Sequence, residues 1–201
     1  MARDKWPHYR LKTMDTFDAI ARRVSTRAFQ PHAVPREVLA HLLDAAVRAP
    51  NHKLTEPWRF AVLSGASRDR YAEVRRIHRA AKFPDPAAPE AARAIEKTWR
   101  EAQGTPAIVV VMCAVSDDAV RREEDYGSAM MATQNLLTAA TAEGLGTYVR
   151  TGGIMDEPAV RELARCPADH RIVALVSVGY PLADEPPRRR TPAAEKTVWL
   201  E

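Results

Sequence analysis

The sequence predicts an α+β or α/β sandwich, in which helices cover both faces of one β-sheet. Strand-like and helix-like segments alternate along the chain. The strand-like segments are short and apolar on both faces, as in a sheet that is covered on both sides. The chain has 201 residues, of which 46% are hydrophobic, so it can form one domain with a well-packed core.

The first part of the chain predicts three helices and one strand. Residues 14–22 place apolar side chains at helical spacing, and an amphipathic helix begins at Pro35 and closes before Pro50. WRFAVLS at 58–64 has the length and composition of a buried strand. The charged residues 67–82 follow it as a third helix.

The middle of the chain predicts a loose segment, a strand and a long helix. Four prolines interrupt residues 84–106, so we expect a short helix around 90–102 inside a mobile, poorly packed flap. AIVVVMC at 107–113 is a second buried strand. Residues 123–143 form a helix that is apolar on most sides, which indicates a central or interface position.

The last part predicts two strands around a short helix. GTYVR starts a strand at residue 146, residues 156–165 form a helix, and RIVALVSVGYP at 171–181 forms the fourth strand. The tail is basic, then broken by proline, and ends in the β-prone TVWL. Trp199 and Leu200 need an apolar partner surface, for which a second subunit is the simplest source.

Composition and charge argue against several classes of protein. The net charge of +4 is spread along the chain without a basic block that contains aromatic residues, so we expect no nucleic-acid binding. Cys113 ends a buried strand and Cys166 precedes a loop proline, which predicts neither a disulfide framework nor a metal site. With no long apolar stretch and no apolar signal core, we expect a cytoplasmic protein that does not associate with membranes.

Sequence motifs for covalent hydrolysis, nucleotide-driven work and metal catalysis are missing. We find no G-x-S-x-G, no Walker A sequence and no paired metal spacing among the six histidines. GLGT at 144–147 follows a helix and precedes a strand, which is the wrong order for a Rossmann turn.

Basic residues near the first helix could hold an anion. Arg23 and Arg27 lie four residues apart with Ser25 between them, so their donors can converge on one phosphate. A solvated basic helix end, favourable to the helix dipole, explains the same residues. The tail residues 188–190 add three arginines, which alone indicate solvated surface.

Two further segments allow two interpretations each. Arg48 and His52 follow a helix, where they either favour its dipole or reach a ligand. Residues 149–151, Val-Arg-Thr, precede Gly152 and Gly153, which form a simple turn or let backbone N–H groups approach a ligand closely.

Taken in order, these segments resemble the nitroreductase family of flavoproteins, and in particular its short, YdjA-like branch. The similarity covers roughly residues 14–199, and its specificity comes from the joint order and spacing of the motifs. The matching stretches are RVSTRAF at 23–29, PREVL at 35–39, RAPNHK at 48–53, PWRF at 57–60, the helix and GLGT end within 127–147, VRTGG at 149–153, VSVGYP at 176–181 and RRRTP at 188–192.

The resemblance implies a three-layer α-β-α sandwich with a mostly antiparallel central sheet, assembled as an intertwined homodimer. It divides the chain into an N-terminal arm at 1–13, an FMN-binding domain at 14–187 and a C-terminal arm at 188–201. The C-terminal arm would carry phosphate-binding arginines and contact the partner subunit.

The resemblance also implies an FMN-dependent oxidoreductase. Such an enzyme takes hydride from NADH or NADPH and then reduces a nitroaromatic, a quinone or a related small acceptor in ping-pong fashion. The flavin carries the chemistry, so no catalytic side chain is expected. The choice between NADH and NADPH stays open because no residue that reads the ribose or its phosphate can be assigned.

The family pattern assigns roles to eleven residues. The FMN phosphate and pyrimidine edge would be held by Arg23, Ser25, Arg27, Arg188 and Arg190, and the flavin would meet the backbone of Val24. The second subunit would contribute Arg48 and His52. The isoalloxazine would be lined by Val149, Arg150 and Thr151, with a main-chain N–H near N5.

Three features depart from the family pattern. Val24 stands where Arg or His is usual, and Glu56 places a carboxylate where Gln or Asn is common before Pro-Trp. Residues 84–104 match no family pattern and are expected to shape the substrate pocket.

Two rival functions remain: the same flavin fold with dehalogenation, dehydrogenation or flavin breakdown, and a non-enzymatic α/β protein that binds an anion or nucleic acid.

Overall fold

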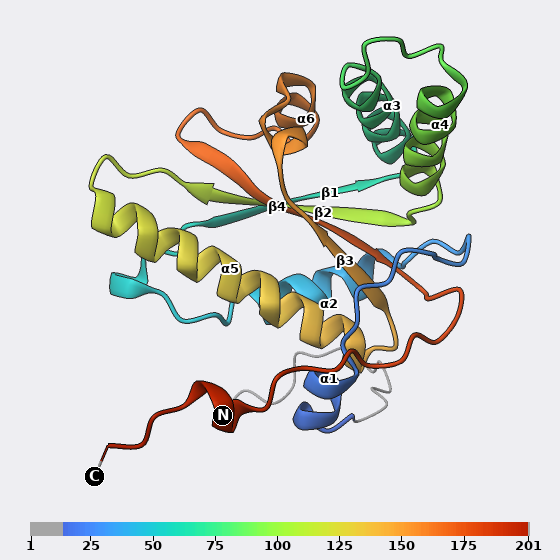
Figure 1. The fold of residues 1–201 in the computed structure, drawn as a ribbon. Coiled ribbons are helices and arrows are strands. Elements are labelled where there is room, and N and C mark those ends of the chain that lie inside the picture. Colours follow the sequence, from blue (N-terminus) through green and yellow to red (C-terminus); the bar gives the residue numbers. More distant parts are fainter. Residues whose placement is uncertain (1–13, 201) are drawn as a thin grey trace.

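The fold is built on one four-stranded antiparallel sheet, seen in a computed structural model that describes residues 14–200 (Figure 1). The strand order is β1-β2-β4-β3, so β1 and β3 form the two edges. This confirms the predicted sandwich and selects α+β, because every strand pairing is antiparallel. The strands are β1 (Trp58–Ser64), β2 (Ala107–Ala114), β3 (Gly146–Arg150) and β4 (His170–Gly179).

Helices cover both faces of the sheet, as predicted (Figure 1). One face carries α1 (Thr16–Arg22), α2 (Arg36–Ala46) and α5 (Ala119–Ala142). The opposite face carries α3 (Ala66–Ala80), α4 (Pro89–Gln103) and α6 (Pro158–Leu163). Residues 14–200 also contain three short 3-10 helices: η1 (His52–Leu54), η2 (Gly153–Asp156) and η3 (Ala193–Lys196).

The central strand β2 explains why two helix layers are needed. Its side chains alternate between the faces, and both sets are apolar. Val109 and Val111 pack in the core that α2 and α5 cover, whereas Ile108 and Val110 pack in the core below α3 and α6. All four are at most 2% exposed, so each face excludes water only because a helix layer covers it.

The helix ends follow from local capping. The Asp15 carboxylate accepts a hydrogen bond from Phe17 N at 2.8 Å and so caps α1. Asp118 accepts from Arg121 N at 2.8 Å in the same way, so α5 begins at Ala119 rather than at the predicted residue 123. Gly144, at φ +75°, follows the end of that helix in the left-handed conformation that glycine favours.

The short helix expected around 90–102 is confirmed, but the expectation of a poorly packed flap at residues 84–106 is wrong. The segment contains the regular 15-residue helix α4, with Pro89 in its first turn, where proline is compatible with a helix. Ala91, Ile95 and Ala102 are buried, and α4 packs along α3 (Figure 1). Small apolar residues at helical spacing therefore outweighed the arginine-rich composition.

The C-terminal tail runs along the surface after Pro181. Residues 197–200 form no strand despite their β-prone composition, and Trp199 and Leu200 are 84% and 91% exposed. The predicted N-terminal arm at 1–13 lies outside the described residues. Each helix in residues 14–200 is too short or too polar to cross a membrane.

Candidate functional site

The predicted anion-binding segment lies against the outer edge of β3. Thr26 N donates to the carbonyl of Thr147 at 2.8 Å, and Ser25 forms an isolated parallel bridge with Thr147. A Cβ atom at Gly146 would lie 2.6 Å from Thr26 Oγ1, so only glycine permits this approach. The segment thus covers part of an edge that would otherwise be unpaired.

The backbone of this segment is extended, so successive side chains point to opposite sides. Thr26 is only 2% exposed, whereas its neighbours Ser25 and Arg27 are exposed. Arg23, two residues before Ser25, is half-buried at the end of α1. Because side chains alternate in an extended chain, Arg23, Ser25 and Arg27 belong to the side away from the buried Thr26.

Tyr148 joins two of the predicted site residues. The guanidinium carbons of Arg27 and Arg150 each lie 5.0 Å from the centroid of its ring, within cation–π range. Tyr148 and Arg150 project to the face that carries α3 and α4, since their β4 partners Ser177 and Leu175 alternate in step. A small polar hollow beside Tyr148 is also lined by Glu101 of α4.

Val149 differs from Arg150 in its direction. It packs against the core cluster that includes α2 and α5, on the opposite face of the sheet. Thr151 and Gly152 follow β3, and Gly152 has φ +105°, a conformation that side chains rarely adopt. The structure therefore groups Arg150 and Thr151 on the α3 side of the sheet, where both line one cavity, and separates the Val149 side chain from them.

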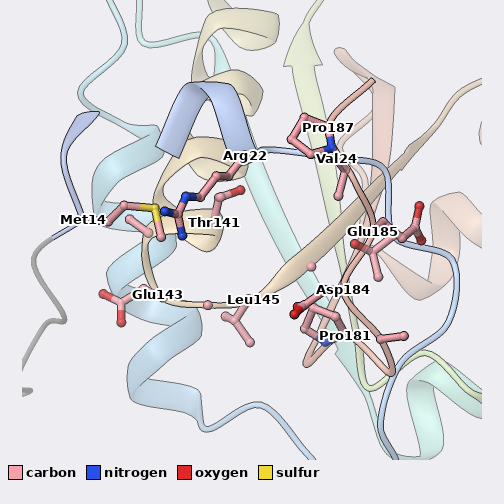
Figure 2. A pocket seen from close by; sticks show the side chains of 15 residues that line it. Met14, Arg22, Val24, Thr141, Glu143, Leu145, Pro181, Asp184, Glu185 and Pro187 are labelled. Atoms are coloured by element: carbon pink, nitrogen blue, oxygen red, sulfur yellow. The ribbon is translucent and has the colours of Figure 1, made fainter. Parts of the chain in front are cut away.

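A cavity of about 890 Å³ lies on the other side of the 23–27 segment (Figure 2). Val24 and Thr26 line it, together with Met14, Arg22 and the connection between α5 and β3. Asp184, Glu185 and Pro187, from the start of the tail, close its far wall. Of the predicted site residues only Val24 reaches this cavity, so size alone does not mark the site.

Arg48 and His52 are exposed and lie in the connection between α2 and β1. Because β1 and β3 are opposite edges of the sheet, one chain does not bring them to Arg27 and Arg150. Their connection is conformationally unusual: Lys53, Leu54 and Glu56 have φ angles of 51°, 53° and 44°. Positive φ values in consecutive non-glycine residues cost energy and cluster at ligand-binding sites.

The departure at Glu56 is held in place by its neighbour. Glu56 N donates to Asn51 Oδ1 at 2.9 Å, and the Glu56 side chain is exposed. Next to it, Thr55 donates to the buried Asp125 of α5 at 2.7 Å. The carboxylate of Glu56 is therefore free to face solvent or a ligand at this edge.

The tail arginines are not gathered at the 23–27 segment. Arg188 and Arg190 are exposed, and within residues 14–200 the hydrogen bonds of Arg190 go to carbonyls of the tail itself. Pro187, which directly precedes Arg188, lines the same cavity as Val24 of the segment. Residues 14–200 contain no cluster of three or more potential metal ligands.

Sequence reasoning missed Tyr148, Glu101 and Arg75, which line the α3 side of the site. Tyr148 could have been found, because it lies two residues before Arg150 on a strand and so shares its face. Arg75 and Glu101 lie on separate charged helices, and no local pattern distinguishes them from solvated helix residues. Burial lowers the pKa of Arg75, and the nearby charge of Arg150 lowers this pKa further.

Comparison with known proteins agrees with this architecture. The family model described as Nitroreductase family matches residues 20–180. YdjA of Escherichia coli (strain K12), which is named as an NAD(P)H nitroreductase, is 31% identical over 84% of this chain and 89% of its own length. The nitroreductase-like protein of Bacillus cereus superposes with a TM-score of 0.80, at 28% identity, over 94% of this chain and 97% of that one.

A more distant structure shows the same fold. The FMN-dependent nitroreductase NfnB of Mycobacterium smegmatis, solved in complex with NADPH, gives a TM-score of 0.72 at 21% identity, over 91% of this chain and 96% of that one. The family model spans residues 20–180, which is most of the chain. The chain therefore belongs to the nitroreductase family.

Proposed function

We propose that this protein is an FMN-dependent oxidoreductase that uses NADH or NADPH to reduce nitroaromatics, quinones or related small electrophiles. The observation that carries the proposal is the placement of Arg27 and Arg150 around Tyr148, beside the exposed Ser25. YdjA is named for NAD(P)H nitroreduction, and NfnB is FMN-dependent and binds NADPH, which supports the cofactor and the hydride donor.

Residues of the edge segment would hold the phosphate end of the flavin. Arg23, Ser25 and Arg27 share one side of an extended chain and offer guanidinium and hydroxyl donors, which suit phosphate oxygens. Arg188 and Arg190 would close on the same phosphate once the tail is seated. The fit is chemical: the segment is cationic, exposed and held rigidly by Thr26 and Gly146.

The end of β3 would hold the ring. The glycines after Thr151 leave the backbone accessible, so an N–H group of residues 150–152 can donate to N5. When bound, FMN supplies hydride acceptance and electron delivery to the acceptor, and the chain supplies position and electrostatics. The positive charge of Arg27 and Arg150 would favour the reduced, anionic form of the ring.

The complete site would need two subunits. Arg48 and His52 lie at the sheet edge opposite Arg27, so a second copy would bring them to the flavin. Large apolar side chains are exposed on the α1–α2–α5 side, which is the side such a copy would cover. They include Phe17, Ile20, Val47, Leu54 and Met131. The C-terminal arm, with Trp199 and Leu200, would lie on the partner.

The visible absorption spectrum of the purified protein tests the cofactor. A flavin spectrum, with FMN as the chromophore released by heat, is the expected result. A colourless protein that also fails to take up added FMN would contradict the proposal. Turnover of NADH and NADPH with nitrofurazone or a quinone then tests the reaction, with flavin-free protein as the control.

A further inference from the structure

A strongly basic cavity of about 320 Å³ lies between α3, α4 and the connection that follows β3. Four Lys/Arg cations line its wall: Arg75 and Arg79 of α3, Lys82 in the turn after that helix, and Arg150 of β3. Glu101 of α4 is the acidic residue that lines it. His78 also lines the cavity, but its ring pairs with Glu157, so its charge is matched locally when it is protonated.

Arg75 is the most unusual of these cations. It is only 9% exposed, and none of the residues 14–200 forms a hydrogen bond or close ion pair with its guanidinium group. Burial and the like charge of Arg150 both lower its pKa, against weaker opposing effects of Tyr71 and Glu101. Holding a positive charge on a residue this buried is costly, and Arg75 lines the cavity, so an anion bound there would relieve this cost.

Arg79 contributes a buried unsatisfied donor to the same wall. Its Nε atom is buried and has no hydrogen-bond partner among residues 14–200, while its guanidinium lies 4.9 Å from the ring centroid of Phe83. Buried polar atoms in folded proteins nearly always have partners. Two arginines one helical turn apart, both with unused donors and both lining one cavity, match the donor pattern of a carboxylate or phosphate site.

Arg76, on the same helix, shows the ordinary alternative. It is exposed, and its Nε donates to the Glu73 carboxylate at 2.9 Å on the outer surface. Arg76 therefore has a counter-charge on the outer surface, which Arg75 lacks among residues 14–200. What distinguishes Arg75 is its direction, toward the cavity beside Arg150.

We propose that this cavity is an anion-binding subsite, in which Arg75 and Arg79, with Arg150, hold a carboxylate or phosphate of a bound reactant. The inference rests on the proposed function, because Arg150 and Thr151 would connect the cavity to the flavin ring. The anion has two sources, a carboxylate on an aromatic acceptor or a phosphate of the nicotinamide dinucleotide. Arg75 is a binding residue in either case.

Calorimetric binding to the oxidised, FMN-loaded enzyme tests the subsite without turnover. The probes are 4-nitrobenzoate, its neutral analogue 4-nitrobenzamide, and NADP⁺. We expect Arg75→Met to weaken the binding of 4-nitrobenzoate by about tenfold or more, as loss of a charge-assisted contact does. The binding of 4-nitrobenzamide should not change. Arg76→Gln is the matched control on the same helix and should bind all three probes like the wild type.

The pattern of losses identifies the source of the anion. If only the binding of 4-nitrobenzoate is weakened, the subsite belongs to the acceptor. If only the binding of NADP⁺ is weakened, it belongs to the dinucleotide. The proposal is overturned if Arg75→Met binds both anions as the wild type does, or if the wild type binds neither. It is also overturned if the variant loses FMN, because the cavity would then belong to the cofactor phosphate.

Arg79→Gln provides the same comparison if Arg75→Met does not fold. Its Nε is the buried donor without a hydrogen-bond partner among residues 14–200, and we expect the same tenfold weaker binding of one anion with unchanged binding of the amide. If the enzyme does not reduce nitro compounds but its anion binding depends on Arg75 or Arg79, the proposed reaction is contradicted and the subsite is still supported. The two proposals therefore fail on separate measurements.

Discussion

Arg27 and Arg150 come from segments more than a hundred residues apart, yet each guanidinium carbon lies 5.0 Å from the centre of the Tyr148 ring. The ring faces two cations that would otherwise repel each other across open solvent. Because an aromatic face attracts cations, Tyr148 helps to hold both arginines beside the edge segment.

Tyr148→Leu should weaken FMN binding, because Arg27 and Arg150 lose the surface that positions them. Two cation–π contacts worth roughly 0.5–1 kcal/mol each predict a dissociation constant raised by about fivefold to thirtyfold. Titration of flavin-free protein with FMN, followed by flavin fluorescence, measures the change. Tyr148→Phe keeps the ring and should bind like the wild type; equal loss in both variants would show that the hydroxyl matters instead.

The double variant Arg23→Ala, Arg27→Ala should lose FMN on dialysis while its fold and assembly persist. Both side chains are at least partly solvent-accessible, so their removal leaves the core intact. The flavin-to-protein absorbance ratio after dialysis, with circular dichroism and light scattering alongside, measures both outcomes. Full FMN occupancy in this variant would mean that the phosphate is held elsewhere.

Met131→Glu should shift the protein toward a monomer. Met131 is 42% exposed on α5, on the side where Phe17 and Leu54 are each 81% exposed, and a charge there would be buried by a second copy. Sedimentation velocity measures the shift. Ile77→Glu is the control, since Ile77 is 58% exposed on α3 at the other face of the sheet. Identical sedimentation of both variants and the wild type would place the interface elsewhere.

Gly146→Ala should destabilise the fold at the contact between β3 and the edge segment. The added methyl group would lie 2.6–2.7 Å from three atoms of Thr26, so the segment must move, at a cost of about 1–3 kcal/mol. The urea midpoint measures this loss. Gly104→Ala, whose methyl group would meet only the Arg100 carbonyl at 3.2 Å, should change the midpoint less. The reverse order would contradict the close approach.

Cys113 should resist alkylation in the folded protein at pH 8. Burial, reinforced by the nearby Asp125 carboxylate, raises the pKa of its thiol to about 11. A raised pKa means that the reactive thiolate is scarce until the pH approaches that value, and burial also limits access. Mass spectrometry after iodoacetamide treatment should show Cys113 modified only in denaturant. Fast labelling of Cys113 in the native protein would refute its placement in the core.

Local sequence pattern was sufficient to predict most of the elements. The spacing of apolar residues predicted α2 and β2, and the charged residues 67–82 predicted α3. These predictions work because the burial of each side chain depends on the 3.6- or 2-residue period of its own segment. The error at residues 84–106 has the same origin. Composition suggested a loose flap, but Ala91, Ile95 and Ala102 are buried only because α3 lies alongside.

Part of the candidate site was also predictable from the sequence. The family resemblance implied that the 23–29 motif and the end of β3 hold the flavin, and the structure brings Arg27 and Arg150 together. The separation of the Val149 side chain from Arg150 followed from strand alternation, which the motif comparison did not take into account. Arg48 and His52 lie at the far edge of the sheet, a placement that depends on strand order.

By itself, the sequence determined where the chain is helical or extended, which motifs it carries and which chemistries it lacks, since these depend on neighbouring residues. Only the tertiary structure decided the strand order, the antiparallel pairing and the meeting of α3, α4 and β3 around Arg75 and Glu101. Those relationships depend on long-range packing, in which covering both faces of the sheet outweighs local preference. An arginine that resembles any solvated helix residue in the sequence becomes a buried, unpaired cation only through that packing.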